Sequence, residues 1–140
     1  MCLVLYMSSE RERPTILWDE KAPRFHVVAN DTDSQQALAH FSKPHVYYLG
    51  SDNGCGCGFR QEVDYMIDEL EELASKQDNQ QRLHDYLEKC LVDEDYVELF
   101  SCWSGDEVEP IESRRNITLA DLISPDFYFS ERQISIVFRE

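Results

Sequence analysis

The sequence predicts an α+β fold: a single domain over residues 1–140, in which two or three helices cover a mixed, mostly antiparallel sheet. Three observations predict this fold. The length of 140 residues is that of one ordinary domain. No internal repeat, low-complexity tract or linker divides the chain. Strand and helix patterns alternate through most of the chain, and strand patterns dominate its last part.

The first part of the chain predicts several strands and one short helix. Residues 2–7 form a short, almost wholly apolar run, which is typical of a buried strand. Residues 15–19 and 25–29 predict further short strands. Residues 32–35 have the pattern of a capping box at the start of a short helix. His45–Gly50 predicts a strong strand, because β-branched and aromatic residues fill it.

The second part predicts two helices followed by strands. Residues 60–76 and 80–91 place their apolar side chains at helical spacing. Tyr96–Trp103 alternates between two faces, as a strand does, and Glu98 shares a face with Cys102. The remaining predicted elements are a strand at 108–117, a helical turn capped by Thr118, and a closing hairpin of 127–129 with 133–138.

The net charge of −15, from 28 acidic and 13 basic side chains, limits the partners. Nucleic acids and anionic membranes are bound through basic surfaces, so we expect neither as a partner. No apolar run reaches the roughly 20 residues of a membrane span. The charge favours solubility, or alternatively forms an acidic helix face that docks a basic protein partner. That face consists of Asp64, Asp68, Glu71 and Glu72.

The five cysteines are Cys2, Cys55, Cys57, Cys90 and Cys102. Because their number is odd and no secretion signal precedes them, we expect free thiols in a reducing compartment, and hence a cytoplasmic protein. Cys90 falls at a helical core position, where a cysteine packs as a small apolar residue.

The Gly-Cys-Gly-Cys-Gly run at residues 54–58 is the strongest candidate site. Its three glycines, of five in the chain, permit positive φ and close approach of the backbone. Two thiols in front of a helix start are expected to have a lowered pKa. Cys55 and Cys57 then suit zinc, copper(I) or a redox-active disulfide. The alternatives are two small cysteines packed in a structural turn, or an anion-binding nest.

A metal at this loop needs ligands from elsewhere, because a tetrahedral zinc site has four ligands and the C-x-C pair supplies two. Cys102 is the first candidate, since its strand is expected to neighbour His45–Gly50. Cys2 is the second candidate, since its strand is expected in the same sheet. Three histidines are further options: His26, His40 and His45.

Three other features have both a chemical and a structural interpretation. Cys2, after removal of Met1, would carry its own α-amine as a base, as in N-terminal cysteine hydrolases, or else face the core from a strand. Residues 18–20, Trp-Asp-Glu, form either a sugar or cation site or a solvated turn. Glu98, if buried, needs a partner such as an arginine. Hydrolase and metalloprotease motifs are absent from the sequence, which favours a binding module over an enzyme.

Four short segments, about a fifth of the chain, resemble a known group of proteins. They are residues 1–6 (MCLVLY), 18–20 (WDE), 41–51 (FSKPHVYYLGS) and 54–59 (GCGCGF). Together they resemble a group of small uncharacterised bacterial proteins. The resemblance implies a bacterial cytoplasmic origin and brings no activity, cofactor or partner with it.

The sequence thus leads to one main hypothesis and two others. The main one is a cytoplasmic thiol-based binding or redox module centred on Cys55 and Cys57. The second is a non-enzymatic acidic module for protein–protein interaction, and the third is an N-terminal cysteine hydrolase.

Overall fold

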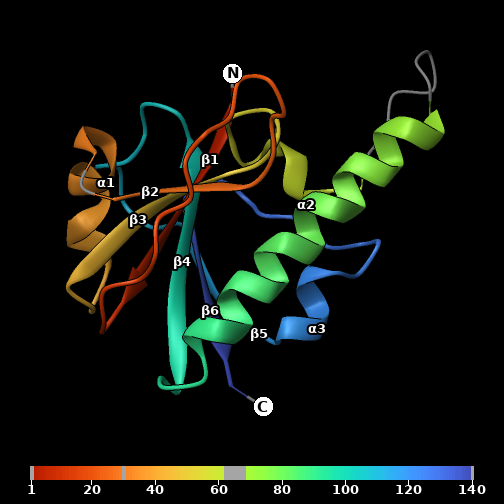
Figure 1. The fold of residues 1–140 in the computed structure, drawn as a ribbon. Coiled ribbons are helices and arrows are strands. Elements are labelled where there is room, and N and C mark those ends of the chain that lie inside the picture. Colours follow the sequence, from red (N-terminus) through yellow and green to blue (C-terminus); the bar gives the residue numbers. More distant parts are fainter. Residues whose placement is uncertain (1, 30, 62–68, 140) are drawn as a thin grey trace.

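A six-stranded sheet runs through the molecule, with the strand order β2-β3-β1-β4-β6-β5 (Figure 1). It is seen in a computed structural model that describes residues 2–29, 31–61 and 69–139. All neighbouring strands pair antiparallel except β5 and β6, which run parallel. The strands are β1 (Leu3–Ser9), β2 (His26–Ala29), β3 (His45–Gly50), β4 (Tyr96–Trp103), β5 (Ser113–Ile117) and β6 (Gln133–Phe138).

Helices cover both faces of this sheet, which confirms the predicted α+β fold (Figure 1). The long helix α2 and the short α3 pack on one face, and α1 packs on the other. The helices are α1 (Thr32–Ala37), α2 (Glu69–Cys90) and α3 (Leu119–Leu122), with 3-10 turns η1 (Leu38–His40) and η2 (Gly56–Phe59). No helix within the described ranges is long and apolar enough to cross a membrane.

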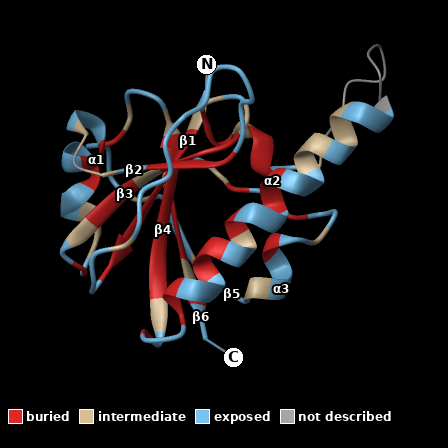
Figure 2. Ribbon diagram, in the orientation of Figure 1, coloured by how far each residue is buried: buried red, intermediate tan, exposed pale blue. Residues whose placement is uncertain are grey.

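The central strand β1 explains how the two layers of the core are divided. Leu5 and Met7 join the core beneath α2, whereas Val4 and Tyr6 join the core beneath α1. Both sets are buried, because β1 lies between β3 and β4 and has a covered layer on each side (Figure 2). The sequence of a strand that is buried on both faces is a continuous apolar run. This is why the apolar run at residues 2–7 predicted a buried strand here.

Several predicted elements have different bounds in the structure. The two helices predicted at 60–76 and 80–91 are one helix where the chain is described, because no glycine or proline interrupts residues 77–79. Residues 62–68, part of the first predicted helix, lie outside the described residues. Helix α1 begins one residue earlier than predicted, since the Asp31 carboxylate accepts the Ser34 amide at 2.9 Å.

Three predicted strands also differ. Residues 15–19 contribute a single bridge, between Ile16 and Val27. In the predicted strand at 108–117 only the last five residues are β5, because Pro110 has no amide hydrogen for a ladder. The predicted closing hairpin is wrong: residues 127–129 form no strand, and β6 pairs with β4 and β5 instead. Thr118 does cap α3, in a complete capping box with Asp121.

Candidate functional site

The Gly-Cys loop leaves the end of β3 and passes over the start of β1. Its backbone is held by hydrogen bonds from Ser51, whose amide and hydroxyl donate to the Cys55 carbonyl at 2.8 and 2.6 Å. The Gly54 amide donates back to the Ser51 carbonyl at 2.9 Å, and the Tyr48 hydroxyl donates to the Gly54 carbonyl. Residues 51–55 therefore form an ordered turn that is fixed to the end of β3.

Two glycines of the loop have the roles that the sequence predicts. Gly54 has a φ of 85°, in the left-handed region that favours glycine. Gly58 lies so close to Ser51 and Asn79 that a Cβ atom there would stand 2.3 Å from the Ser51 hydroxyl oxygen and 2.8 Å from the Asn79 side-chain nitrogen. Any larger residue at position 58 would therefore displace the loop.

The loop brings three thiols together. The sulfur atoms of Cys2, Cys55 and Cys57 all lie within 4.8 Å of one another. Cys55 is buried, Cys57 is half-buried and Cys2 is exposed. Around a tetrahedral zinc ion with Zn–S bonds of about 2.3 Å, two sulfur atoms stand about 3.8 Å apart. Closing the group around an ion thus takes shifts of about 1 Å, within the reach of rotamer adjustments.

Cys2 occupies this group because of how β1 and β3 pair. The two strands are antiparallel, with Leu5 opposite Leu49, so the start of β1 lies beside the end of β3. The loop that follows β3 must then pass next to Cys2. Cys2 stands just before β1 and is exposed, so the expectation of a core-facing strand cysteine is wrong.

Cys102, the first candidate for an additional ligand, is not part of the group. Its strand β4 was expected beside β3, but β1 lies between them. The register places Cys102 opposite Val4, and its side chain is fully buried in the layer beneath α1. Burial, with the negative charges of Glu107 and Asp106, raises the pKa of the Cys102 thiol to about 12. The three candidate histidines are also outside the group.

The electrostatics of the loop differ from the expectation of a lowered pKa. Burial raises the pKa of Cys55 to about 12, against an opposing hydrogen bond from the Cys57 backbone. The turn η2 has only four residues, so its dipole is too small to reverse the effect of burial. Burial and the nearby thiols also raise the pKa of the Tyr48 hydroxyl. Without a cation, Cys55 is therefore a neutral thiol at neutral pH.

A cavity of 650 Å³ borders the group at Cys57. Cys57 and Leu3 form part of its wall, together with four aromatic residues: Phe59, Trp103, Tyr128 and Phe129. The Arg60 guanidinium lies 4.9 Å from the centre of the Tyr128 ring. Of the three thiols, Cys57 is the one that lines this cavity.

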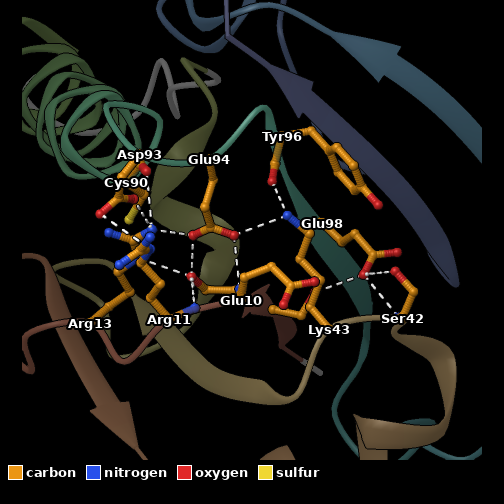
Figure 3. A network of polar contacts seen from close by, with 12 residues as sticks. Glu10, Arg11, Arg13, Ser42, Lys43, Cys90, Asp93, Glu94, Tyr96 and Glu98 are labelled. Carbon is orange, nitrogen blue, oxygen red and sulfur yellow. Dashed lines mark hydrogen bonds and ion pairs between the residues drawn. The ribbon is translucent and has the colours of Figure 1, made fainter.

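A buried charge cluster centres on Glu94 (Figure 3), and no local sequence pattern predicted it. The Glu94 carboxylate accepts hydrogen bonds from Lys43 at 2.9 Å, from the Glu10 amide at 2.8 Å, and from Ser9 and Arg13. Burial alone would raise the pKa of Glu94, but these donors outweigh it and lower the pKa to about 2. The cluster ties the chain after β1 to the start of β4.

Three other residues singled out from the sequence, Glu98, Cys90 and His26, are buried and contact other parts of the fold. Glu98 is buried, and its partners are the hydroxyls of Ser8 and Ser42 at 2.8 and 2.9 Å and the Ser42 amide, rather than the expected arginine. Cys90 packs in the core beneath α2, as predicted. His26 is buried, with its ring centre 4.7 Å from that of Trp18.

Only half of the predicted acidic helix face can be placed. Asp64 and Asp68 lie outside the described residues. Glu71 is exposed and Glu72 is half-buried. The interaction surface therefore stays a prediction.

Comparison with protein families, with curated proteins and with solved structures finds no match for this chain. The chemistry of the site therefore rests on the geometry of its three thiols.

Proposed function

We propose that this protein is a cytoplasmic thiol-based module that binds one soft metal ion through Cys2, Cys55 and Cys57. The observation that carries the proposal is the approach of three thiols, from two separate segments of the chain, to within 4.8 Å of one another. Thiolates are the ligands that favour copper(I) and zinc. A reducing compartment keeps such thiols free to act as ligands.

The raised pKa of Cys55 favours metal binding over redox cycling. Disulfide exchange depends on the thiolate, and a buried thiol with a pKa of about 12 supplies very little of it at neutral pH. A metal ion brings its own positive charge into the site, displaces the thiol proton and stabilises the thiolate directly. Burial thus opposes the disulfide reaction more than it opposes coordination.

The geometry suits copper(I) without a further ligand, because three thiolates complete a trigonal site. Zinc requires a fourth ligand, and within the described residues no histidine or carboxylate joins the group. For zinc, that ligand would come through the cavity beside Cys57, as water or a small molecule. Copper(I) is therefore the first ion to test.

The direct experiment is an anaerobic titration of the reduced protein with copper(I), in competition with a chromophoric copper(I) chelator. We expect one ion per chain and a thiolate-to-copper absorption band in the ultraviolet. Cys55→Ser and Cys57→Ser should each weaken binding strongly. Cys90→Ala is the matched control, since Cys90 is a buried thiol in the other core layer.

The proposal is overturned by two outcomes. One is a wild-type protein that does not compete with the chelator for either copper(I) or zinc. The other is a loss of binding in Cys90→Ala as large as in Cys57→Ser, which would mean that binding reports general folding rather than this site.

A further inference from the structure

A wide cavity lies between the connection from β1 to β2 and the helix α2. It has a volume of 1040 Å³ and is walled by residues 14–25 on one side and by the second half of α2 on the other. The Tyr86 hydroxyl of α2 donates to the Pro14 carbonyl at 2.8 Å and fixes the two walls to each other. We call this cavity the Trp18 groove.

Three aromatic side chains, Trp18, Phe25 and Tyr86, line the Trp18 groove. Phe25 and Tyr86 are buried, with ring centres 5.6 Å apart. Trp18 is held edge-on by His26 and still exposes 40% of its surface. Leu17 beside it is 88% exposed. An indole that is fixed in place and open to solvent offers a flat face for stacking with a planar ligand.

The charge of the groove is opposite to that of the whole chain. Four of the 13 basic side chains line it, compared with three of the 28 acidic ones. The basic residues are Lys21, Arg24, Arg82 and Lys89, and the acidic ones are Asp19, Glu20 and Asp85. Arg82 pairs with Asp78, but the side chains of the other three bases make no hydrogen bond or ion pair with any residue that the structure describes.

We propose that the Trp18 groove binds a small organic anion with a flat aromatic body. The ring system would stack on Trp18, and the anionic group would pair with Lys21, Arg24 and Lys89. The volume of 1040 Å³ is just above the range of about 300–1,000 Å³ for small-molecule sites. The open cations supply the few convergent polar contacts that such sites use for orientation. This site is separate from the three thiols and does not depend on them.

The experiment compares two fluorescent probes that differ in charge. 8-Anilinonaphthalene-1-sulfonate is a flat aromatic anion, and N-phenyl-1-naphthylamine is its neutral counterpart. We expect the anion to bind more tightly, and the double variant Arg24→Glu, Lys89→Glu to weaken it about tenfold or more, as loss of charge-assisted contacts does. Arg114→Glu is the control, because Arg114 is exposed on β5, at the other edge of the sheet from β2 (Figure 1).

Competition with two other aromatic anions then identifies the chemical class of the ligand. Displacement of the sulfonate probe by adenosine monophosphate points to nucleotides, and displacement by 2-naphthoate points to aromatic carboxylates. Either result supports the proposal if Trp18→Ala also weakens the competitor while thermal unfolding stays unchanged. Equal binding of the two probes, or equal losses in the double variant and in Arg114→Glu, would overturn it.

Discussion

The thiols of Cys2 and Cys57 lie within 4.8 Å of each other although they belong to different segments of the chain. Their approach follows from the antiparallel pairing of β1 with β3, which sets the beginning of one strand beside the end of the other. The third thiol of the group is thus supplied by strand pairing, whereas the first two are supplied by local spacing.

Cys2→Ser should lower only the metal affinity, and Cys102→Ser should lower only the stability. Cys2 is exposed, so its replacement should weaken copper(I) binding and leave thermal unfolding almost unchanged. Cys102 is fully buried, so a serine there should lower the free energy of unfolding by about 1–3 kcal/mol and leave copper(I) binding intact. Chelator competition and thermal unfolding on the same samples measure both quantities. If both variants weakened copper(I) binding equally, Cys2 could not be assigned as a ligand in preference to Cys102.

The metal-free protein should lose stability in alkaline solution. Cys55 ionises near its ordinary pKa of 9.0 when unfolded, but at about 12 when folded. Its contribution to stability is therefore complete below pH 9 and is lost as the pH rises from about 9 to 12, because only the unfolded state releases the proton in that range. Unfolding by denaturant at several alkaline pH values measures this loss. Cys55→Ala should show a smaller loss, since the residue that titrates is gone.

Metal binding should depend on pH in the opposite direction. The ion replaces protons on its thiol ligands, so the apparent affinity should increase as the pH is raised from 6 toward 9. The change in proton number can be measured by calorimetry in buffers of different ionisation enthalpy. An affinity that does not vary with pH would mean that the ligands are not thiols with ordinary or raised pKa values.

The sequence could predict the site only as far as local spacing reached. Cys55 and Cys57 are two positions apart, so any fold keeps them close. Cys2 and Cys102 both required a strand order, and several orders fit the same set of strands. Placing β4 beside β3 made Cys102 the better ligand, whereas the observed order places β1 there and brings Cys2 to the loop.

The fold was predictable wherever one pattern dominated. His45–Gly50 and Tyr96–Trp103 have the predicted bounds, because each combines β-forming residues with clear turn signals on both sides. Residues 127–129 are also β-forming aromatic residues but form no strand, since β5 takes the place beside β6 that a hairpin partner would need. The pairing of Glu94 with Lys43 and Arg13 had no local pattern at all, because the three residues come from distant segments.

Gly58→Ala should destabilise the loop and the metal site together. The new Cβ atom would meet the side chains of Ser51 and Asn79 at 2.3 to 2.8 Å, well inside contact distance. Ser51 holds the Cys55 carbonyl, so its displacement moves a ligand. We expect a loss of about 1–3 kcal/mol in the free energy of unfolding, as for other overpacked sites, and weaker copper(I) binding. Ser75→Ala, on α2 outside the loop, is a control that should leave copper(I) binding unchanged.

Glu94→Gln tests the buried charge cluster. The substitution removes the negative charge that Arg13 and Lys43 share. The amide nitrogen of the glutamine is a donor, so it cannot accept the hydrogen bonds that the carboxylate oxygen accepts. Removal of one partner from a buried pair costs about 3–5 kcal/mol, and we expect a loss of that size in denaturant unfolding. The adjacent Asp95→Asn is the matched control, because Asp95 pairs with Arg139 on the exposed surface, and its loss should change stability little.

The same carboxylate sets the response of this cluster to acid. The pKa of Glu94 is lowered in the folded state to about 2 from an ordinary value of 4.5. Its contribution to stability is therefore complete above about pH 4.5 and is lost as the pH falls from 4.5 toward 2, where only the unfolded state takes up the proton. Acid unfolding of the wild type should be steeper over this range than that of Glu94→Gln, which has no proton to bind at this position. Parallel acid unfolding curves for the two proteins would show that the Glu94 carboxylate is not held in its charged form by Arg13 and Lys43.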